Sequence, residues 1–165
     1  MADMFINIDG IKGDSTDDKH KDWIELESYC QRMHQPMGGA RSAQGVHTGG
    51  RVEHDDFVLT KRLDKASPLL AEYCCTGKHI PNIRFELCRA MGEKTTFMVY
   101  TFKDTIIASV QTSGSANTED PIPMEEVTLR YGEIQWEYTP TDIASGAKKG
   151  PAVKSGWSVW TNKKM

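Results

Sequence analysis

Three patterns are missing from this 165-residue sequence: a long apolar run, a signal-peptide pattern in its first residues and an excess of basic residues. A membrane-spanning helix needs about 20 consecutive apolar residues, and no stretch approaches that length. The first residues, Met1–Met4, lack the basic and apolar regions of a cleaved secretory signal. The net charge is −3, from 20 basic and 23 acidic residues. The chain therefore has no overall positive charge to attract nucleic acid or an anionic membrane surface. We expect no nucleic-acid partner, no membrane insertion, and a cytoplasmic protein that could leave the cell only without a cleaved signal peptide.

The cysteines are few, and their spacing matches no common disulfide or metal-binding motif. The chain has four cysteines, Cys30, Cys74, Cys75 and Cys88, and none forms a C-x-x-C pair. Such spacing favours neither a disulfide framework nor a zinc site. We therefore expect buried or half-buried free thiols and no bound cofactor.

Strand patterns dominate what is present. Phe5–Ile8 and Ile83–Arg89 alternate between apolar and polar residues, as half-buried strands do. Ala90–Glu93 predicts a turn, and Thr95–Phe102 predicts the returning strand. This return strand is apolar on both faces, so we expect a helix or another subunit to cover its second face. Phe97 and Val99 lie on one face, and Met98, Tyr100 and Phe102 lie on the other. Lys103-Asp104 predicts a short link to a further strand, Thr105–Thr112, with Ile106, Ala108 and Val110 on one face.

Two segments change the side of their apolar residues partway along. Val127, Leu129 and Tyr131 share one parity, whereas Ile134, Trp136 and Tyr138 share the other. Because side chains alternate strictly, this pattern predicts a β-bulge or sharp bend at Gly132-Glu133. In the strand expected over Trp23–Met33, Ile24 and Leu26 agree in parity, but Tyr29 and Met33 are opposite. Bent strands of this kind are typical of a curved, barrel-like sheet.

One helix is predicted, with Ser67 as its N-cap, Pro68 at its first position and Gly77 at its end. Its apolar stripe consists of Leu69, Leu70, Tyr73 and Cys74. The fold class is therefore all-β: an antiparallel β-barrel of two packed curved sheets with one short α-helix. We expect a single domain over residues 1–165.

Clusters of polar residues offer only weak signs of chemistry. His47, Glu53, His54, Asp55 and Asp56 could ligate a metal, but a charged entry to a strand explains them equally well. Ser42, His47 and Asp55 could form a nucleophilic set, but no G-x-S-x-G elbow supports it. Asp14, Asp17, Asp18 and His20 form an acidic cluster that lacks the pattern of a calcium loop, which favours a solvated connection. We expect no enzyme activity, no catalytic residue and no metal site.

Four segments, in order along the chain, resemble the hemolysin-coregulated protein family, Hcp. They are Ile8–Glu25, Arg51–Phe57, Lys61–Pro68 and Leu129–Tyr138, and the resemblance extends from about residue 4 to about residue 160. It implies a tube subunit of a bacterial type VI secretion system, which forms homo-hexameric rings. The rings would stack inside a contractile sheath beneath a spike protein and would carry effector proteins in the lumen.

The resemblance gives three sets of candidate residues their roles. Alternation in Trp23–Met33 puts Tyr29 and Met33 toward the core and leaves Ser28, Cys30 and Arg32 to face the lumen. The long glycine-rich loop Gln35–Arg51 would contact the next ring or the sheath through Arg41, Gln44, His47 and Thr48. Phe97, Met98, Tyr100 and Phe102 are the subunit-interface candidates. The alternative functions are a small-molecule-binding β-barrel or hydrolase-like enzyme, and an adaptor domain that does not assemble.

Overall fold

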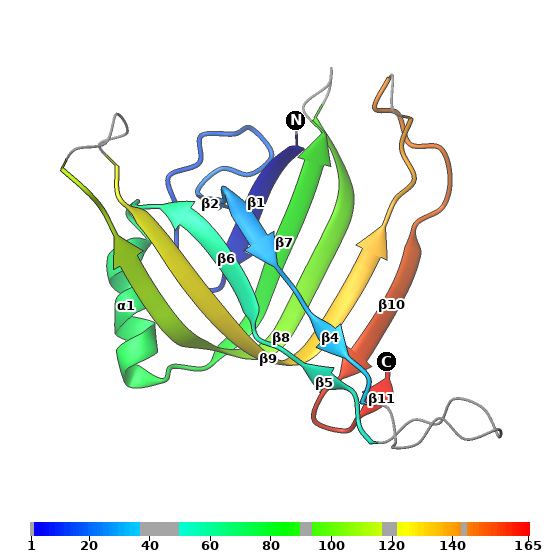
Figure 1. Cartoon of the computed structure of the whole chain (residues 1–165). Helices are drawn as coiled ribbons and strands as arrows, with labels where there is room; N and C mark the ends of the chain where they lie inside the picture. The colour runs from blue at the N-terminus through cyan, green and yellow to red at the C-terminus, as the bar shows by residue number, and fades with distance from the viewer. Residues whose placement is uncertain (1, 37–49, 90–93, 117–121, 143–144) are drawn as a thin grey trace.

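The computed structural model describes residues 2–36, 50–89, 94–116, 122–142 and 145–165. Over these residues the chain forms a nine-stranded antiparallel sheet, a separate two-stranded ribbon and one helix (Figure 1), which confirms the all-β class. The elements are β1 (Ala2–Ile8), β2 (Ile24–Glu25), β3 (Ser28–Cys30), β4 (Met33–His34), β5 (Glu53–His54), β6 (Phe57–Arg62), α1 (Ser67–Thr76), β7 (Ile80–Arg89), β8 (Thr95–Ser113), β9 (Met124–Tyr138), β10 (Val153–Ser158) and β11 (Lys163–Lys164).

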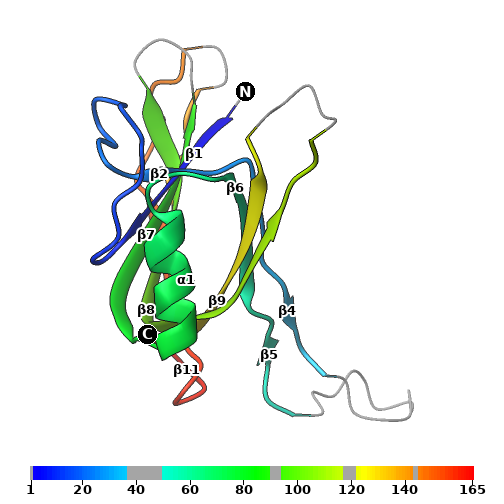
Figure 2. The same ribbon diagram turned by 90° about the vertical axis from the view of Figure 1, so that its left-hand side faces the viewer.

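The large sheet folds over itself into two layers because β8 and β9 each run through both (Figure 2). In the first layer the strand order is β2-β1-β7-β8-β9-β10-β11. In the second layer β6 pairs with the first part of β9, from Met124 to Leu129, and β3 pairs with β6. The two layers face each other across the core, as expected for a barrel built from curved sheets.

The change of side in β9 occurs at the expected place, and it is a bend without a slip in register. Thr105 pairs with Tyr131 and Lys103 pairs with Glu133, so the ladder between β8 and β9 keeps its phase across Gly132. Asp104 adopts a left-handed backbone with φ of 51°, which turns β8 in step with β9. The predicted link at residues 103–104 is therefore wrong, because β8 continues through this kink as a single strand.

A β-bulge further along β8 overturns the predicted face of that segment. The register with β9 shifts between Ile107 and Ser109. As a result Ile107 is buried, whereas Ile106 and Ala108 are only half-buried. One extra residue at a bulge moves every following side chain to the other face. Val110, beyond the bulge, packs against the core, so the prediction that it shares one face with Ile106 is wrong.

The segment predicted as one strand over Trp23–Met33 crosses between the layers instead. The amide of Leu26 donates to the carbonyl of Met4 at 3.0 Å in the first layer, and the next amide, of Glu27, donates to Thr60 at 2.8 Å in the second. The crossing splits the segment into β2, β3 and β4, so no continuous ladder closes the barrel. Tyr29 faces the core, but the same prediction for Met33 is wrong, since it is 46% exposed in the outlying β4–β5 ribbon.

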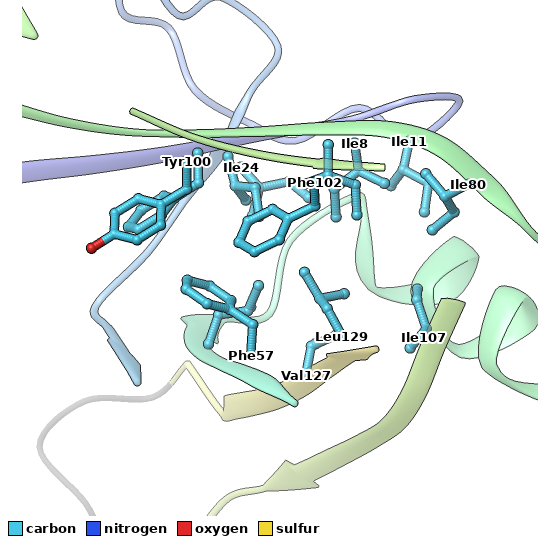
Figure 3. Packing of buried hydrophobic residues seen from close by; sticks show 14 of the residues in the cluster. Ile8, Ile11, Ile24, Phe57, Ile80, Tyr100, Phe102, Ile107, Val127 and Leu129 are labelled. Atoms are coloured by element: carbon cyan, nitrogen blue, oxygen red, sulfur yellow. The ribbon is translucent and has the colours of Figure 1, made fainter. Parts of the chain in front are cut away.

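Aromatic and branched side chains from both layers fill the interior (Figure 3). Phe57 of β6 lies between rings of the opposite layer, with centroids 4.9 Å from Phe102 and 5.6 Å from Phe85. Tyr100 stacks 5.4 Å from Phe85. Burial of one such side chain is worth about 1.5–3 kcal/mol, so this contact between layers is a main source of stability.

The helix α1 covers one end of the barrel and packs against β8 (Figure 2). Leu70 and Tyr73 are buried, and Gly77 ends the helix with φ of 63° as predicted. Leu69, predicted in the apolar stripe, is 36% exposed. The predicted N-cap is one residue off: Ala66 is the cap and Ser67 is the first helical residue, because its hydroxyl bonds to other groups.

Candidate functional surfaces

Two rows of small and polar side chains cross the outer face of the second layer. Strand register aligns Ser28 with Thr60, Thr60 with Glu126, and Glu126 with Gln111. Residues directly opposite each other in antiparallel strands point to the same side. The neighbours at alternate positions, such as Leu59 and Val127, are buried, so these rows face away from the core. We call this the small-residue face; it consists of Ser28, Thr60, Glu126 and Gln111 in one row and Cys30, Val58, Thr128 and Ser109 in the other.

Of the three lumen candidates, Ser28 and Cys30 lie on the small-residue face and are exposed. Arg32 is exposed too, but it lies beyond the end of β3. Its Nε is 3.6 Å from Oδ2 of Asp55, at the start of the β4–β5 ribbon. The structure therefore brings two of the three together and separates the third.

The interface candidates divide into two groups. Tyr100 and Phe102 are 9% and 0% exposed, so assigning them to a subunit interface is wrong. They belong to the core because the second layer of the same chain covers that side of β8. Phe97 and Met98 are half-buried, and the guanidinium of Arg89 lies 5.2 Å from the Phe97 ring centroid.

Large apolar side chains are exposed along the outer edge of the first layer. Val153 of β10 pairs with Tyr138 of β9, and their exposed fractions are 66% and 43%. Trp160 is 70% exposed, whereas Trp136 and Trp157 pack partly against the core. The described residues of β10 pair with β11 only at Trp157 and Ser158, so most of this edge is left without a neighbouring strand.

The loop candidates Arg41, Gln44, His47 and Thr48 lie outside the described residues, as does Ser42 of the nucleophilic set. The chain enters and leaves this segment through the β4–β5 ribbon, which projects beyond the barrel (Figure 2). At its far end the side-chain amide of Gln35 donates to the carbonyl of Gly50 at 2.9 Å.

The polar residues that follow the loop do not converge on one point. His54 Nδ1 is 3.1 Å from the Tyr131 hydroxyl, and burial lowers the pKa of His54. Asp56 instead accepts two hydrogen bonds from Arg130, at 2.8 and 3.0 Å. This ion pair raises the pKa of Arg130. Among the residues that the structure describes, His54 and Asp56 thus each have their own partner.

A buried polar cluster beside β7 was not predicted. His20 is 2% exposed, because the connection expected to be solvated folds over the first layer. Its Nδ1 lies 2.8 Å from Asp17 Oδ1 and its Nε2 lies 3.1 Å from Glu86 Oε2. The thiol of Cys88, which is 0% exposed, is 3.8 Å from the same Nε2. Burial raises the pKa of Cys88, and no local sequence pattern indicates this meeting of distant segments.

A buried lysine at the start of α1 was also missed. Lys61 is 0% exposed, and its ammonium lies 2.9 Å from Glu125 Oε2 and 2.8 Å from Asp64 Oδ1. It also donates to the Ser67 hydroxyl at 3.1 Å. This network joins β6, β9 and the helix start. The sequence gives one weak indication of this network: Lys61 occupies a position in β6 where the alternation of buried and exposed residues predicts an apolar side chain.

Fold and surfaces together define a protein of the barrel-like all-β class with a filled core. The family described as "Type VI secretion system effector, Hcp" matches residues 5–138. "Protein hcp1" of Pseudomonas aeruginosa is 36% identical over 162 residues, which is 98% of this chain and 97% of that protein. The chain therefore belongs to the Hcp family of the type VI secretion system, whose members are secreted structural proteins.

Solved structures agree with this assignment. "Structure of a type six secretion system protein" aligns with a TM-score of 0.92 and 34% identity, covering 100% of both chains. Hcp1 from Salmonella typhimurium aligns with a TM-score of 0.79 and 32% identity, covering 99% of each chain. A second Pseudomonas aeruginosa relative, "Major exported protein", is 27% identical over 76% of this chain and 74% of its own. None of the described helices has the length and apolar character needed to cross a membrane.

Proposed function

We propose that this chain is a tube subunit of a type VI secretion system, assembled as a homo-hexameric ring. Rings stack inside a contractile sheath beneath a spike protein and leave the cell with effector proteins in their lumen. The subunit is cytoplasmic before secretion and needs no cleaved signal peptide or catalytic step. The observation that carries the proposal is the full-length alignment, with a TM-score of 0.92, to a type six secretion system protein.

The outer edge of β10 supports a contact between subunits. Val153 lies on β10, an edge strand that is mostly unpaired among the described residues, and the exposed Tyr138 lies beside it on β9. Exposed edges of this kind invite pairing with another chain. A closed ring needs two different complementary surfaces on each subunit, and this edge is one of them.

The small-residue face supports a lumen lining. Its side chains are short or polar and none is fully buried, so the surface is smooth and wettable. A channel that takes up folded cargo needs such a wall, because large apolar patches would bind cargo too tightly to release it. Ser28 and Cys30 are part of this face, and we assign the whole face to the lumen.

Mass measurement tests the ring. Size-exclusion chromatography with light scattering should give about six times the subunit mass of 18.5 kDa. Val153→Asp should reduce this mass, since it places a charge in the proposed apolar contact. A monodisperse wild-type monomer at tens of micromolar, roughly the range where a specific interface holds, would overturn the proposal.

A bulky substitution at Cys30 tests the lumen. Cys30→Trp should preserve rings and weaken capture of a co-expressed effector. The matched control is Cys75→Trp on α1, also an exposed cysteine and off the small-residue face. In native rings Cys30 should react with a small maleimide before unfolding; a thiol that reacts only on unfolding would place Cys30 in a subunit contact instead.

The loop beyond the β4–β5 ribbon is assigned to contact with the next ring or with the sheath. The support is the projection of the β4–β5 ribbon from the barrel (Figure 2), since both ends of this segment join the ribbon. Deletion of residues 38–49 should leave rings intact and impair stacking into tubes and secretion. Unfolding of the deletion variant would show instead that the loop is structural.

A further inference from the structure

Three potential metal ligands of different chemistry lie close together between β7 of the first layer and the 10–23 connection that folds over it. His20 Nε2 is 3.1 Å from Glu86 Oε2 and 3.8 Å from Cys88 Sγ, and the three ligand atoms lie within 4.8 Å of one another. Glu86 and Cys88 project from the same side of β7, two positions apart, so the strand sets their spacing. His20 approaches from the 10–23 connection.

Two of the three distances between ligand atoms are close to the edges of a tetrahedron around a zinc ion. Zinc bonds of about 2.0–2.2 Å to nitrogen and oxygen give a nitrogen–oxygen edge of about 3.4 Å. A zinc–sulfur bond of about 2.3 Å gives a nitrogen–sulfur edge of about 3.6 Å. The separations of 3.1 and 3.8 Å differ from these by a few tenths of an ångström, and the third separation, from Glu86 to Cys88, is within 4.8 Å. The Thr96 hydroxyl, 2.7 Å from Glu86 Oε2 and 3.4 Å from Cys88 Sγ, is an oxygen donor beside the fourth position.

The surroundings orient the histidine as metal-binding histidines are oriented. Nδ1–H of His20 donates to Asp17 Oδ1 at 2.8 Å, which turns Nε2 toward Glu86 and Cys88. A carboxylate on the far nitrogen is the usual outer partner of a zinc-bound histidine. The ring stacks on Phe5, with centroids 4.3 Å apart and planes 4° apart, and meets the edge of Trp23. The imidazole plane is therefore fixed by packing.

The charges balance around a divalent cation. A glutamate and a cysteine thiolate supply two negative charges, which neutralise Zn²⁺, and Lys94 lies 2.5 Å from Asp17 Oδ2 to neutralise that carboxylate. Arg84 binds the other oxygen of Glu86, Oε1, at 2.6 Å. A buried charge is tolerated only when it is paired, and the metal with its two anionic ligands meets this condition; the Arg84 side chain is half-exposed.

We propose that His20, Glu86 and Cys88 form a structural Zn²⁺ site that fastens the 10–23 connection to β7. Metal binding displaces the proton of the Cys88 thiol and any proton on His20 Nε2, and these protons go to solvent. Affinity therefore rises with pH, since protons compete for the ligand atoms. The site is closed to substrate, because all three ligand residues are buried, so its role is to stabilise the chain.

The test begins with the full-length protein made in zinc-supplemented medium and purified without chelator. Elemental analysis should find about one Zn²⁺ per chain, and removal of the metal by chelation should lower the melting temperature. Adding Co²⁺ to the metal-free protein should produce thiolate-to-cobalt charge-transfer absorption and the visible bands of tetrahedral cobalt. Zn²⁺ should abolish both signals.

Variants connect the signals to the ligands. Cys88→Ser should lose the charge-transfer absorption, whereas Cys75→Ser, at an exposed cysteine, should keep it. Asp17→Asn should weaken Zn²⁺ binding about 10–100-fold while leaving the three ligands in place. Less than a tenth of an equivalent of metal with no cobalt spectrum would overturn the proposal, and so would a charge-transfer band that survives in Cys88→Ser. Ring mass, measured in parallel, reports separately on the proposed assembly.

Discussion

Removal of the buried ammonium of Lys61 should be among the most damaging conservative changes in this chain. The ammonium is fully buried and lies 2.9 Å from Glu125 and 2.8 Å from Asp64. Lys61→Met keeps the length of the side chain but removes its charge. Two carboxylates are then left without their cation: Glu125 with a side chain 2% exposed, and Asp64 with one 12% exposed.

The expected loss in the free energy of unfolding is about 3–5 kcal/mol, the cost of removing one partner from a buried ion pair. For a chain of this size each 1 kcal/mol corresponds to about 2–4 °C in melting temperature, so the loss is about 6–20 °C. Glu125→Gln should cost less, about 1–3 kcal/mol, because Lys61 keeps Asp64 and the new amide still accepts a hydrogen bond.

Urea unfolding followed by tryptophan fluorescence measures the difference. All variants should be compared at one protein concentration, because assembly makes stability depend on concentration. The matched control is Arg62→Met at the next residue, whose ion pair with Glu27 at 2.8 Å is half-exposed. Exposed pairs contribute about 0–1 kcal/mol. If Lys61→Met costs no more than Arg62→Met, the buried network does not stabilise the join between β6, β9 and α1.

Two further predictions concern backbone space and pH. Gly13→Ala should destabilise by about 1–3 kcal/mol in urea unfolding, because its Cβ would meet the main-chain oxygen of Trp23; Gly50→Ala, with open space at its Cβ, should change stability by less than about 0.5 kcal/mol. Burial lowers the pKa of His54, so its stabilising contribution is present above the ordinary pKa of 6.5 and is lost as pH falls below it. His54→Asn should therefore lose less stability than wild type between about pH 7.5 and about pH 5.5. An equal slope in the two proteins would contradict the assignment to His54.

Period-two patterns were reliable where one strand stays on one face. Ile83, Phe85 and Leu87 are buried as predicted, and the reversal of side in β9 falls at Gly132. Both features are local, because they depend only on the alternation of neighbouring side chains. The same rule wrongly placed Ile106 and Val110 on one face, since a bulge depends on the partner strand and leaves no mark in its own sequence.

Burial by distant segments could not be predicted from local patterns. His20 and Glu86 are 66 positions apart and meet only because the charged connection folds back over β7. The apolar side chains of Tyr100 and Phe102 indicated that something packs on their face of β8. They did not indicate that β6 and β9 of the same chain do so. An apolar face is equally consistent with an internal core and with a subunit interface, so sequence alone could not separate the two.

The candidate lumen surface shows the same division between local and long-range information. Alternation along the 23–33 segment pointed to Ser28 and Cys30, because Tyr29 between them faces the core. The rows that begin at Ser28 and Cys30 continue across β6 and β9 to β8, through Thr60 and Thr128. This continuation depends on the register of four strands, which is set by how the two layers stack. A tube subunit needs a continuous wall, and a single strand cannot supply one. The proposed lumen wall therefore depends on register as much as on residue type: the bend at Gly132 lets β8 and β9 extend into the second layer, and the small-residue face is built on that layer.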